Sequence, residues 1–334
     1  MSYVNFGTGG VKVSRMALGL GFRGQFDRVE AIKVIHKAFD SGINLIDCAN
    51  VYGFMDSRRN IGSSEEVLGQ ALKGHRDDAV ITSKVFSPIG SGPNDSGVSR
   101  YHIMREIERS LKRLDTDHID VYIFHGVDDM SLFEEQFRTM ETLIQQGKIR
   151  YVGVSNFQAW QIIKALQVQK SINAQPLIAV QNPYSLLNRT QEDELFPMLS
   201  ETGIGLMAYS PLAVGLLSGA YSPEQDPDKN TLWGSRRKDQ FANYMQGRVV
   251  KVVLAVDEIA RELGVSMAQV SMAWVLSHDE VTVAISGADN FDQMADVVGA
   301  MDLILPAECI EKLNNVSSGL RNVLDGDDVH ENDD

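Results

Sequence analysis

Short runs of β-branched and aliphatic residues alternate along the chain with longer segments whose apolar residues recur at helical spacing. The run 121–124 is apolar throughout, which is typical of a strand in a parallel sheet that helices cover on both faces. Between such runs, Ile103, Ile107 and Leu111 share one face of a predicted helix. The pattern predicts eight strands, at 16–20, 43–47, 79–84, 119–125, 150–154, 177–181, 205–209 and 281–286.

Eight strands that alternate with helices predict an α/β fold, a closed (β/α)8 TIM barrel, whose functional residues gather at the carboxyl ends of the strands. An N-terminal β-hairpin over 3–6 and 11–14 is expected before the first barrel strand. The interval between the seventh and eighth strands holds a long loop, about 212–240, and two extra helices at 248–263 and 267–276. Further helix is expected at the C-terminus.

Composition and charge narrow the class of protein. The chain has 334 residues, of which 43% are hydrophobic and 23% charged, as in a packed globular protein. A formal charge of −14 argues against a nucleic-acid partner. Six acids fall within the last ten residues, so we expect one barrel domain over 1–324 and a disordered acidic tail over 325–334.

Cysteine content and hydropathy indicate the compartment. Cys48 and Cys309 lie far apart, and the first residues lack a basic region followed by an apolar one. These features exclude a disulfide scaffold and favour a cytoplasmic protein. The uncharged stretch 202–223 is interrupted by glycines and a proline, so we interpret it as a strand and a loop and expect no membrane partner.

A glycine motif suggests a different fold. Gly19, Gly21 and Gly24 match G-x-G-x-x-G after a strand, and Asp47 ends the next strand, which is most of a dinucleotide-binding fingerprint of a doubly wound sheet. In that fold the glycines open the helix directly. Here three residues intervene before the helical period begins near Arg28, which disfavours the alternative.

Chemically active side chains follow three consecutive predicted strands. Asp47, Lys84 and His125 end the second, third and fourth strands, and Tyr52 lies five residues after Asp47. Each alone has an ordinary structural explanation. Asp47 could be a turn or cap residue, Lys84 a solvated strand end and His125 a hydrogen-bonded structural residue. Together at one rim they would form a proton-donating site, because a cation beside a phenol stabilises its phenolate. No H-x-x-x-H or Cys/His cluster predicts a metal, and no G-x-S-x-G predicts a serine hydrolase.

Several longer segments resemble the aldo-keto reductase superfamily, in the branch of bacterial aldo-keto reductases and potassium-channel β-subunits. The resemblance covers nearly the whole chain. It is carried by GVKVS at 10–14, DCANVYG at 47–53, TSK at 82–84, SLKRL at 110–114, HGVD at 125–128, GKIRYVGVSNF at 147–157 and YSPLAVGLLSG at 209–219.

The resemblance implies a catalytic tetrad of Asp47, Tyr52, Lys84 and His125, and a nicotinamide cofactor, NAD(H) or NADP(H). It implies that Ser155, Asn156 and Gln181 hold the carboxamide and that Tyr209 stacks on the ring. Alternatively, Ser155 and Asn156 cap a helix, Gln181 is a buried polar strand end and Tyr209 a core aromatic. The expected cofactor contacts are completed by Gly21, Phe22, Ser210, Leu212, Gly215, Arg237, Ser286, Gly287, Asp289 and Gln293.

One position departs from the family pattern. Relatives that bind NADP typically carry Lys or Arg where this chain has Asp289, and no Lys or Arg occurs in 281–310. A carboxylate accepts a hydrogen bond from a free ribose 2′-hydroxyl, whereas a 2′-phosphate is met by a cation. This favours NAD, unless Asp289 only caps the following helix and Arg236, Arg237 or Lys238 meets the phosphate.

The resemblance implies hydride transfer between the cofactor and an aldehyde, ketone or alcohol, and the polar loop 87–99 suits a sugar-like substrate. The alternative is a cofactor-binding regulatory subunit with little turnover, as in the channel-associated branch. The tetrad histidine is often replaced there, so His125 favours an enzyme. The sequence gives no indication of the oligomeric state.

Overall fold

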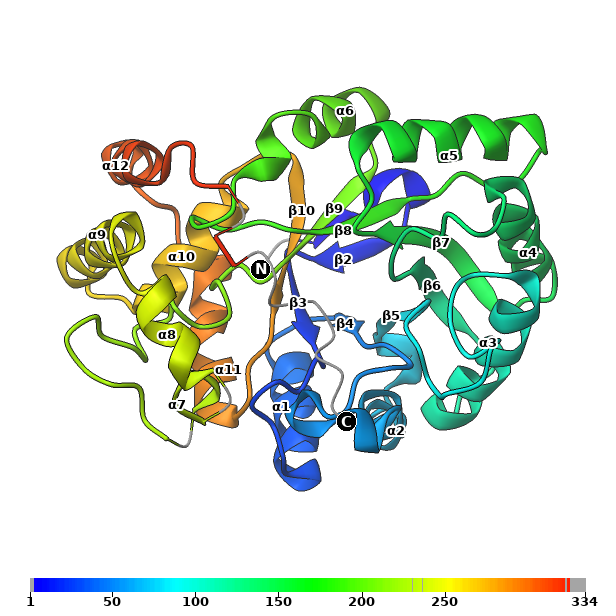
Figure 1. Ribbon diagram of the computed structural model, residues 1–334, viewed down its shortest axis with the longest axis horizontal. Coiled ribbons are helices and arrows are strands. Elements are labelled where there is room, and N and C mark those ends of the chain that lie inside the picture. Colours follow the sequence, from blue (N-terminus) through cyan, green and yellow to red (C-terminus); the bar gives the residue numbers. More distant parts are fainter. Residues whose placement is uncertain (1–2, 230, 236, 322, 325–334) are drawn as a thin grey trace.

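A computed structural model describes residues 3–229, 231–235, 237–321 and 323–324. Eight parallel strands form a closed barrel in the order β10-β3-β4-β5-β6-β7-β8-β9, which confirms the predicted (β/α)8 fold (Figure 1). The barrel strands are β3 (Met16–Gly19), β4 (Leu45–Asp47), β5 (Val80–Val85), β6 (Ile119–Phe124), β7 (Ile149–Ser155), β8 (Ala179–Pro183), β9 (Gly205–Tyr209) and β10 (Val281–Ser286).

Helices surround the barrel and cover the outer faces of its strands (Figure 1). Because most strand residues are thereby buried, the strand sequences are largely apolar, with buried polar residues chiefly toward their carboxyl ends. The covering helices are α1 (Arg28–Asp40), α2 (Ser63–Ala71), α3 (Arg100–Leu114), α4 (Phe133–Gln145), α5 (Ala159–Ser171), α6 (Leu195–Thr202) and α11 (Phe291–Val297). Single turns of 3-10 helix occur at Gly7–Gly9, Phe54–Asp56, Arg58–Asn60, Arg76–Asp78, Thr190–Glu192 and Val298–Met301.

The predicted N-terminal hairpin, β1 (Tyr3–Asn5) and β2 (Lys12–Ser14), closes the amino end of the barrel. Phe6 is fully buried in the cluster that fills the barrel interior. Gly7 has φ of +54°, and a Cβ there would lie 2.1 Å from the carbonyl oxygen of Ile178, so the close approach requires glycine. The carboxyl ends of the strands therefore remain the open end.

The interval between β9 and β10 differs in part from the sequence expectation. The two helices α9 (Arg248–Leu263) and α10 (Met267–Leu276) have the expected bounds, and α12 (Ala307–Ser317) packs against α9 (Figure 1). The expected loop, however, contains the short helix α7 (Leu232–Ser235), and a second short helix, α8 (Lys238–Tyr244), begins near its end. Fully buried Trp233 anchors both helices. With seven residues or fewer, they are too short to show a helical period in the sequence.

The closed barrel shows that the doubly wound alternative is wrong. Two glycines of that motif, Gly19 and Gly24, serve packing instead. A Cβ at Gly19 would lie 2.6 Å from Cγ2 of Ile285, and one at Gly24 would lie 2.2 Å from Oδ2 of Asp289. The first contact joins the end of β3 to β10, and the second joins the loop after β3 to the loop after β10. In the part of the chain that the structure describes, no helix is long and apolar enough to span a membrane. The acidic tail lies outside the described residues.

Candidate active site

The barrel brings the four predicted catalytic residues together at its open end. Asp47 is the last residue of β4, Lys84 lies near the end of β5, and His125 follows β6 directly. Tyr52 reaches the same place from the loop after β4. Parallel register explains this, since β4 pairs with β5 and β5 with β6, so that successive strand ends fall side by side.

A buried ion pair forms the base of the site. Nζ of Lys84 lies 2.7 Å from Oδ2 of Asp47 and donates to the carbonyl oxygen of Cys48 at 3.0 Å. The second carboxylate oxygen, Oδ1, accepts from Thr82 Oγ1 at 2.5 Å and from Gln181 Nε2 at 2.9 Å. Burial, the largest single effect, lowers the pKa of Lys84, but the Asp47 carboxylate together with Tyr52 and Cys48 outweighs it, and the pKa is raised. Lys84 is therefore held as a cation.

Tyr52 lies over this cation. Nζ of Lys84 is 4.6 Å from the centroid of the Tyr52 ring, and Oη of Tyr52 is 3.2 Å from Nε2 of His125. Burial raises the pKa of Tyr52, while the charge of Lys84 opposes the rise. The net shift is upward, so Lys84 offsets only part of the burial effect. The phenol is therefore protonated at neutral pH, as a proton donor must be.

The predicted carboxamide-binding residues form one hydrogen-bonded group beside the tetrad. Oη of Tyr209 donates to Oδ1 of Asn156 at 2.8 Å, and Nδ2 of Asn156 donates to the carbonyl oxygen of His125 at 3.0 Å. Ser155 Oγ donates to the carbonyl oxygen of Gln181 at 2.8 Å. The helix that follows is capped by Gln158, so the alternative in which Ser155 and Asn156 cap it is wrong.

The loop after β9 adopts an unusual backbone where the pyrophosphate was expected. Ser210, Ala213 and Val214 have φ of 53°, 48° and 55°, and Gly215 has φ of 91°. Positive φ is costly for a β-branched residue such as Val214, and such strain is typical of functional loops. Nε1 of Trp233 donates to the carbonyl oxygen of Val214 at 2.9 Å, which ties the α7 segment to this loop.

Of the remaining predicted cofactor residues, several lie on the same rim. Arg237 stacks over the ring of Trp233, with its guanidinium carbon 5.5 Å from the centroid. Phe22 has φ of 51°, and its ring stacks on Phe54 at 4.9 Å between centroids. Gly21, Leu212, Ser286 and Gly287 follow or end barrel strands at this rim.

Asp289 occupies a junction between two loops. Its Oδ1 accepts from the backbone N–H of Gly24 at 3.2 Å, and its carbonyl oxygen accepts from Gln25 Nε2 at 2.5 Å. Its own N–H donates to Gln293 Oε1 at 2.8 Å. Asn290, not Asp289, caps α11, so the helix-cap alternative for Asp289 is wrong. Burial raises the pKa of Asp289 to about 6, against an opposing hydrogen bond from Gly24.

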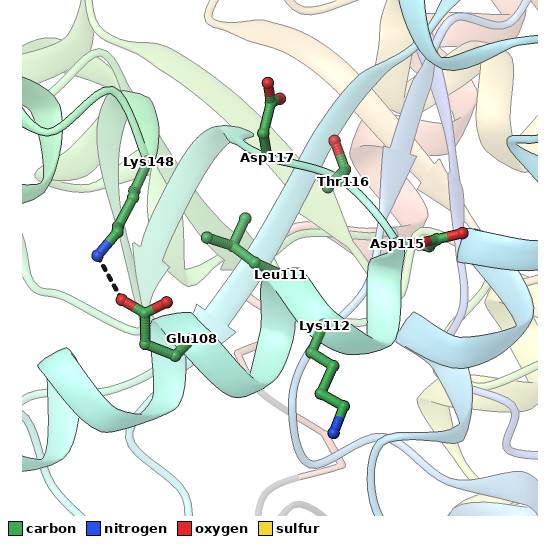
Figure 2. A pocket seen from close by; sticks show the side chains of 7 residues that line it. All are labelled: Glu108, Leu111, Lys112, Asp115, Thr116, Asp117 and Lys148. Atoms are coloured by element: carbon green, nitrogen blue, oxygen red, sulfur yellow. Dashed lines mark hydrogen bonds and ion pairs between the residues drawn. The ribbon is translucent and has the colours of Figure 1, made fainter.

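A surface hollow lies away from this site (Figure 2). It is lined by α3 residues such as Glu108 and by Asp117 and Lys148, which precede β6 and β7, and Lys148 pairs with Glu108. These positions belong to the amino ends of the strands. None of the predicted site residues lines the hollow.

Sequence reasoning missed other residues that touch the site. Thr82 holds Asp47, and its place two residues before Lys84, on the same face of β5, could have indicated it. Oδ1 of Asn182 accepts from the N–H of Asn156 at 2.8 Å. Asn50 contacts Glu106, a pairing that no local pattern indicates, because the two lie 56 positions apart.

The structure is a (β/α)8 barrel with Asp47, Tyr52, Lys84 and His125 grouped at its open end, and comparisons with known proteins identify its family. The sequence pattern described as "Aldo/keto reductase family" matches residues 7–318. The chain belongs to this family, whose members carry out NAD(P)-linked oxidoreduction.

Three similar proteins illustrate the range of names within it. The "Uncharacterized oxidoreductase YrpG" of Bacillus subtilis is 35% identical over 96% of this chain and 97% of its own length. A "Probable voltage-gated potassium channel subunit beta" of Oryza sativa is 35% identical over 95% of this chain and 96% of its own length. The "L-glyceraldehyde 3-phosphate reductase" of Escherichia coli K12 is 31% identical over 90% of this chain and 88% of its own length.

The raised pKa of Asp289 predicts a pH-dependent stability. Since the folded pKa of about 6 exceeds the ordinary 3.8, the stability contributed by the protonated carboxyl is present below about pH 4 and lost as pH rises to 6. Asp289→Asn cannot ionise, so it should be more stable than wild type at pH 7, by on the order of 1–3 kcal/mol. Urea unfolding of the free protein at pH 4 to 8 measures this.

The control is Asp292→Asn, which alters an exposed carboxyl three residues further on, in the first turn of α11. Wild type and Asp289→Asn should converge in stability near pH 4, and Asp292→Asn should follow wild type throughout. A loss of stability at pH 7 in Asp289→Asn would contradict the burial effect.

Proposed function

We propose that the protein reduces an aldehyde or ketone, with Tyr52 as the proton donor. The observation that carries this proposal is the contact of 3.2 Å between Tyr52 Oη and His125 Nε2, above the cationic Lys84. When bound, a reduced nicotinamide dinucleotide supplies a hydride to the carbonyl carbon. Tyr52 gives its proton to the carbonyl oxygen, which completes the reduction of the carbonyl group to an alcohol.

Each neighbour of Tyr52 has a distinct part in this step. His125 hydrogen-bonds the carbonyl oxygen through Nε2 and orients it toward the phenol. Lys84 stabilises the phenolate that remains after proton transfer, because its charge favours the ionised ring. Asp47 keeps Lys84 charged and, through Gln181, joins the ion pair to the residues proposed for the carboxamide.

The cofactor is proposed to lie along the rim from β7 to β10. Ser155, Asn156 and Gln181 offer amide and hydroxyl groups for a carboxamide, and the Tyr209 ring is fixed by Asn156 for stacking. The turned backbone at 210–215 suits a pyrophosphate, since consecutive positive-φ residues can direct backbone N–H groups toward an anion. Gly21, Phe22, Leu212, Arg237, Ser286, Gly287, Asp289 and Gln293 complete the proposed contacts.

A polar, sugar-like carbonyl compound is the substrate class we favour. The loop between β5 and α3 is polar, and Asp95 holds it by accepting from the N–H of Gly92 at 2.9 Å and from Arg105 at 2.7 Å. The name of the Escherichia coli relative, a reductase of a phosphorylated aldehyde, is in keeping with this class. A regulatory role without turnover is less favoured, because Asp47, Tyr52, Lys84 and His125 are all present and in contact.

Replacing Tyr52 by phenylalanine tests the proton donor. Tyr52→Phe keeps the ring and removes the hydroxyl, so kcat for carbonyl reduction should fall by about 10²–10⁴-fold, the usual contribution of a positioned acid. Cofactor affinity, measured by quenching of tryptophan fluorescence, should change little. The matched control is Tyr151→Phe, which loses a hydroxyl bonded to the carbonyl oxygen of Gly9 at the closed end. Near-normal turnover in Tyr52→Phe would refute the assignment.

The charge of Asp289 predicts preference for the cofactor that lacks a 2′-phosphate, namely NAD(H). A carboxylate beside that phosphate would set like charges together. In Asp289→Arg the ratio of the NADH and NADPH dissociation constants should move toward NADPH by about 5- to 150-fold, the range of typical coupling energies. Fluorescence titration with each cofactor measures the ratio, with Asp292→Arg as the control. Strong native preference for NADPH, unchanged in Asp289→Arg, would show that Asp289 does not contact the ribose.

A further inference from the structure

Tyr52 stands on an irregular turn rather than on a strand. The N–H of Tyr52 donates to the carbonyl oxygen of Ala49 at 3.3 Å and closes the turn, and the N–H of Asn50 donates to the carbonyl oxygen of Lys84 at 3.4 Å. Ser64, at the start of α2, donates through Oγ to Ala49 at 3.0 Å and through its N–H to Tyr52 at 3.3 Å. The position of the Tyr52 hydroxyl therefore depends on what holds this turn.

Asn50, inside the turn, has a fully buried side chain. Its Nδ2 donates to Oε2 of Glu106 at 3.3 Å. Its Oδ1 has no hydrogen-bond partner among the residues that the structure describes. A buried amide left half-satisfied is unfavourable and calls for an explanation beyond packing. The bond to Glu106 is what fixes the amide's direction.

Glu106 is built to hold that bond. It lies on α3 and is only 1% exposed. Its other oxygen, Oε1, accepts from Arg109 at 2.8 Å and lies 3.5 Å from Nε of Arg105. These arginines lie nearer the surface and neutralise the carboxylate from outside, so Oε2 remains for Asn50. Because Oε1 is paired with the arginines, the buried carboxylate is held in one orientation, and Oε2 stays directed at Asn50.

We propose that Asn50, held by Glu106, is a positioning residue that sets the Tyr52 hydroxyl against His125. The proposal rests on the function proposed above, in which Tyr52 donates the proton. The bond connects the turn to α3, a helix fixed by seven buried residues, and so ties the proton donor to an element that contributes no residue of the tetrad. Without it the turn can shift relative to β5, and the hydroxyl with it.

Removing the amide should therefore act on the chemical step. In Asn50→Ala, kcat should fall by about 10- to 100-fold, the cost of misplacing a reacting group by roughly 1 Å. The cofactor dissociation constant should stay at the wild-type value. The control is Gln169→Ala, which removes another buried amide, on α5. The Gln169 amide donates to the carbonyl oxygen of Gln175 and accepts from the N–H of Leu177. It should lower the unfolding midpoint and leave kcat unchanged.

A double variant separates positioning from a general structural role. If Asn50 acts through the Tyr52 hydroxyl, Asn50→Ala should cost nothing further in a Tyr52→Phe background, because the group that it positions is gone. An additional loss of the same size in that background would overturn the proposal. Failure of the proposed function gives a different result, since Tyr52→Phe itself would then retain activity.

An exchange of donor and acceptor provides a test that does not require an alanine variant to fold. Asn50→Asp alone places a carboxylate against Glu106 and should lose kcat as Asn50→Ala does. Asn50→Asp combined with Glu106→Gln restores a hydrogen bond of reversed direction and should recover most of kcat. Wild-type kcat in Asn50→Asp alone, or no recovery in the combined variant, would overturn the proposal.

Discussion

The buried ion pair between Lys84 and Asp47 is the interaction on which the site depends. Lys84 is fully buried, which an ammonium group tolerates only beside a paired charge. Breaking a buried pair by removing one partner typically costs about 3–5 kcal/mol. The strand register sets the two side by side, and the pair in turn places a cation beneath the Tyr52 ring and connects it through Gln181 to the rim.

The amino end of the barrel provides packing, whereas the predicted site residues lie at the carboxyl end. The amino end is closed by the hairpin, with Phe6 filling the interior and Gly7 allowing close contact with Ile178. The carboxyl end carries residues in costly conformations, such as Phe22 and Val214, and the partly buried carboxyl of Asp289. Such local costs at one end are tolerated because the rest of the structure holds these groups in place.

The sequence was sufficient for the barrel and for the grouping of the four tetrad residues, because periodic apolar runs define the strands and strand ends define one rim. The bounds of α9 and α10 followed from their amphipathic pattern. The short helices around Trp233 did not, since they complete one or two turns and rely on a buried indole. The junction of Asp289 with Gly24 and the bond of Asn50 to Glu106 are long-range contacts that leave no local signal.

The most direct test of the central claim is the pH dependence of kcat/KM for alcohol oxidation, in wild type and in Lys84→Met. In the proposed mechanism the Tyr52 phenolate accepts the proton in this direction, so the rate should rise with pH as the phenol ionises. Since the charge of Lys84 lowers the pKa of Tyr52 against the effect of burial, its removal should move the rising limb to higher pH. A rising limb at the same pH in both proteins would contradict the account.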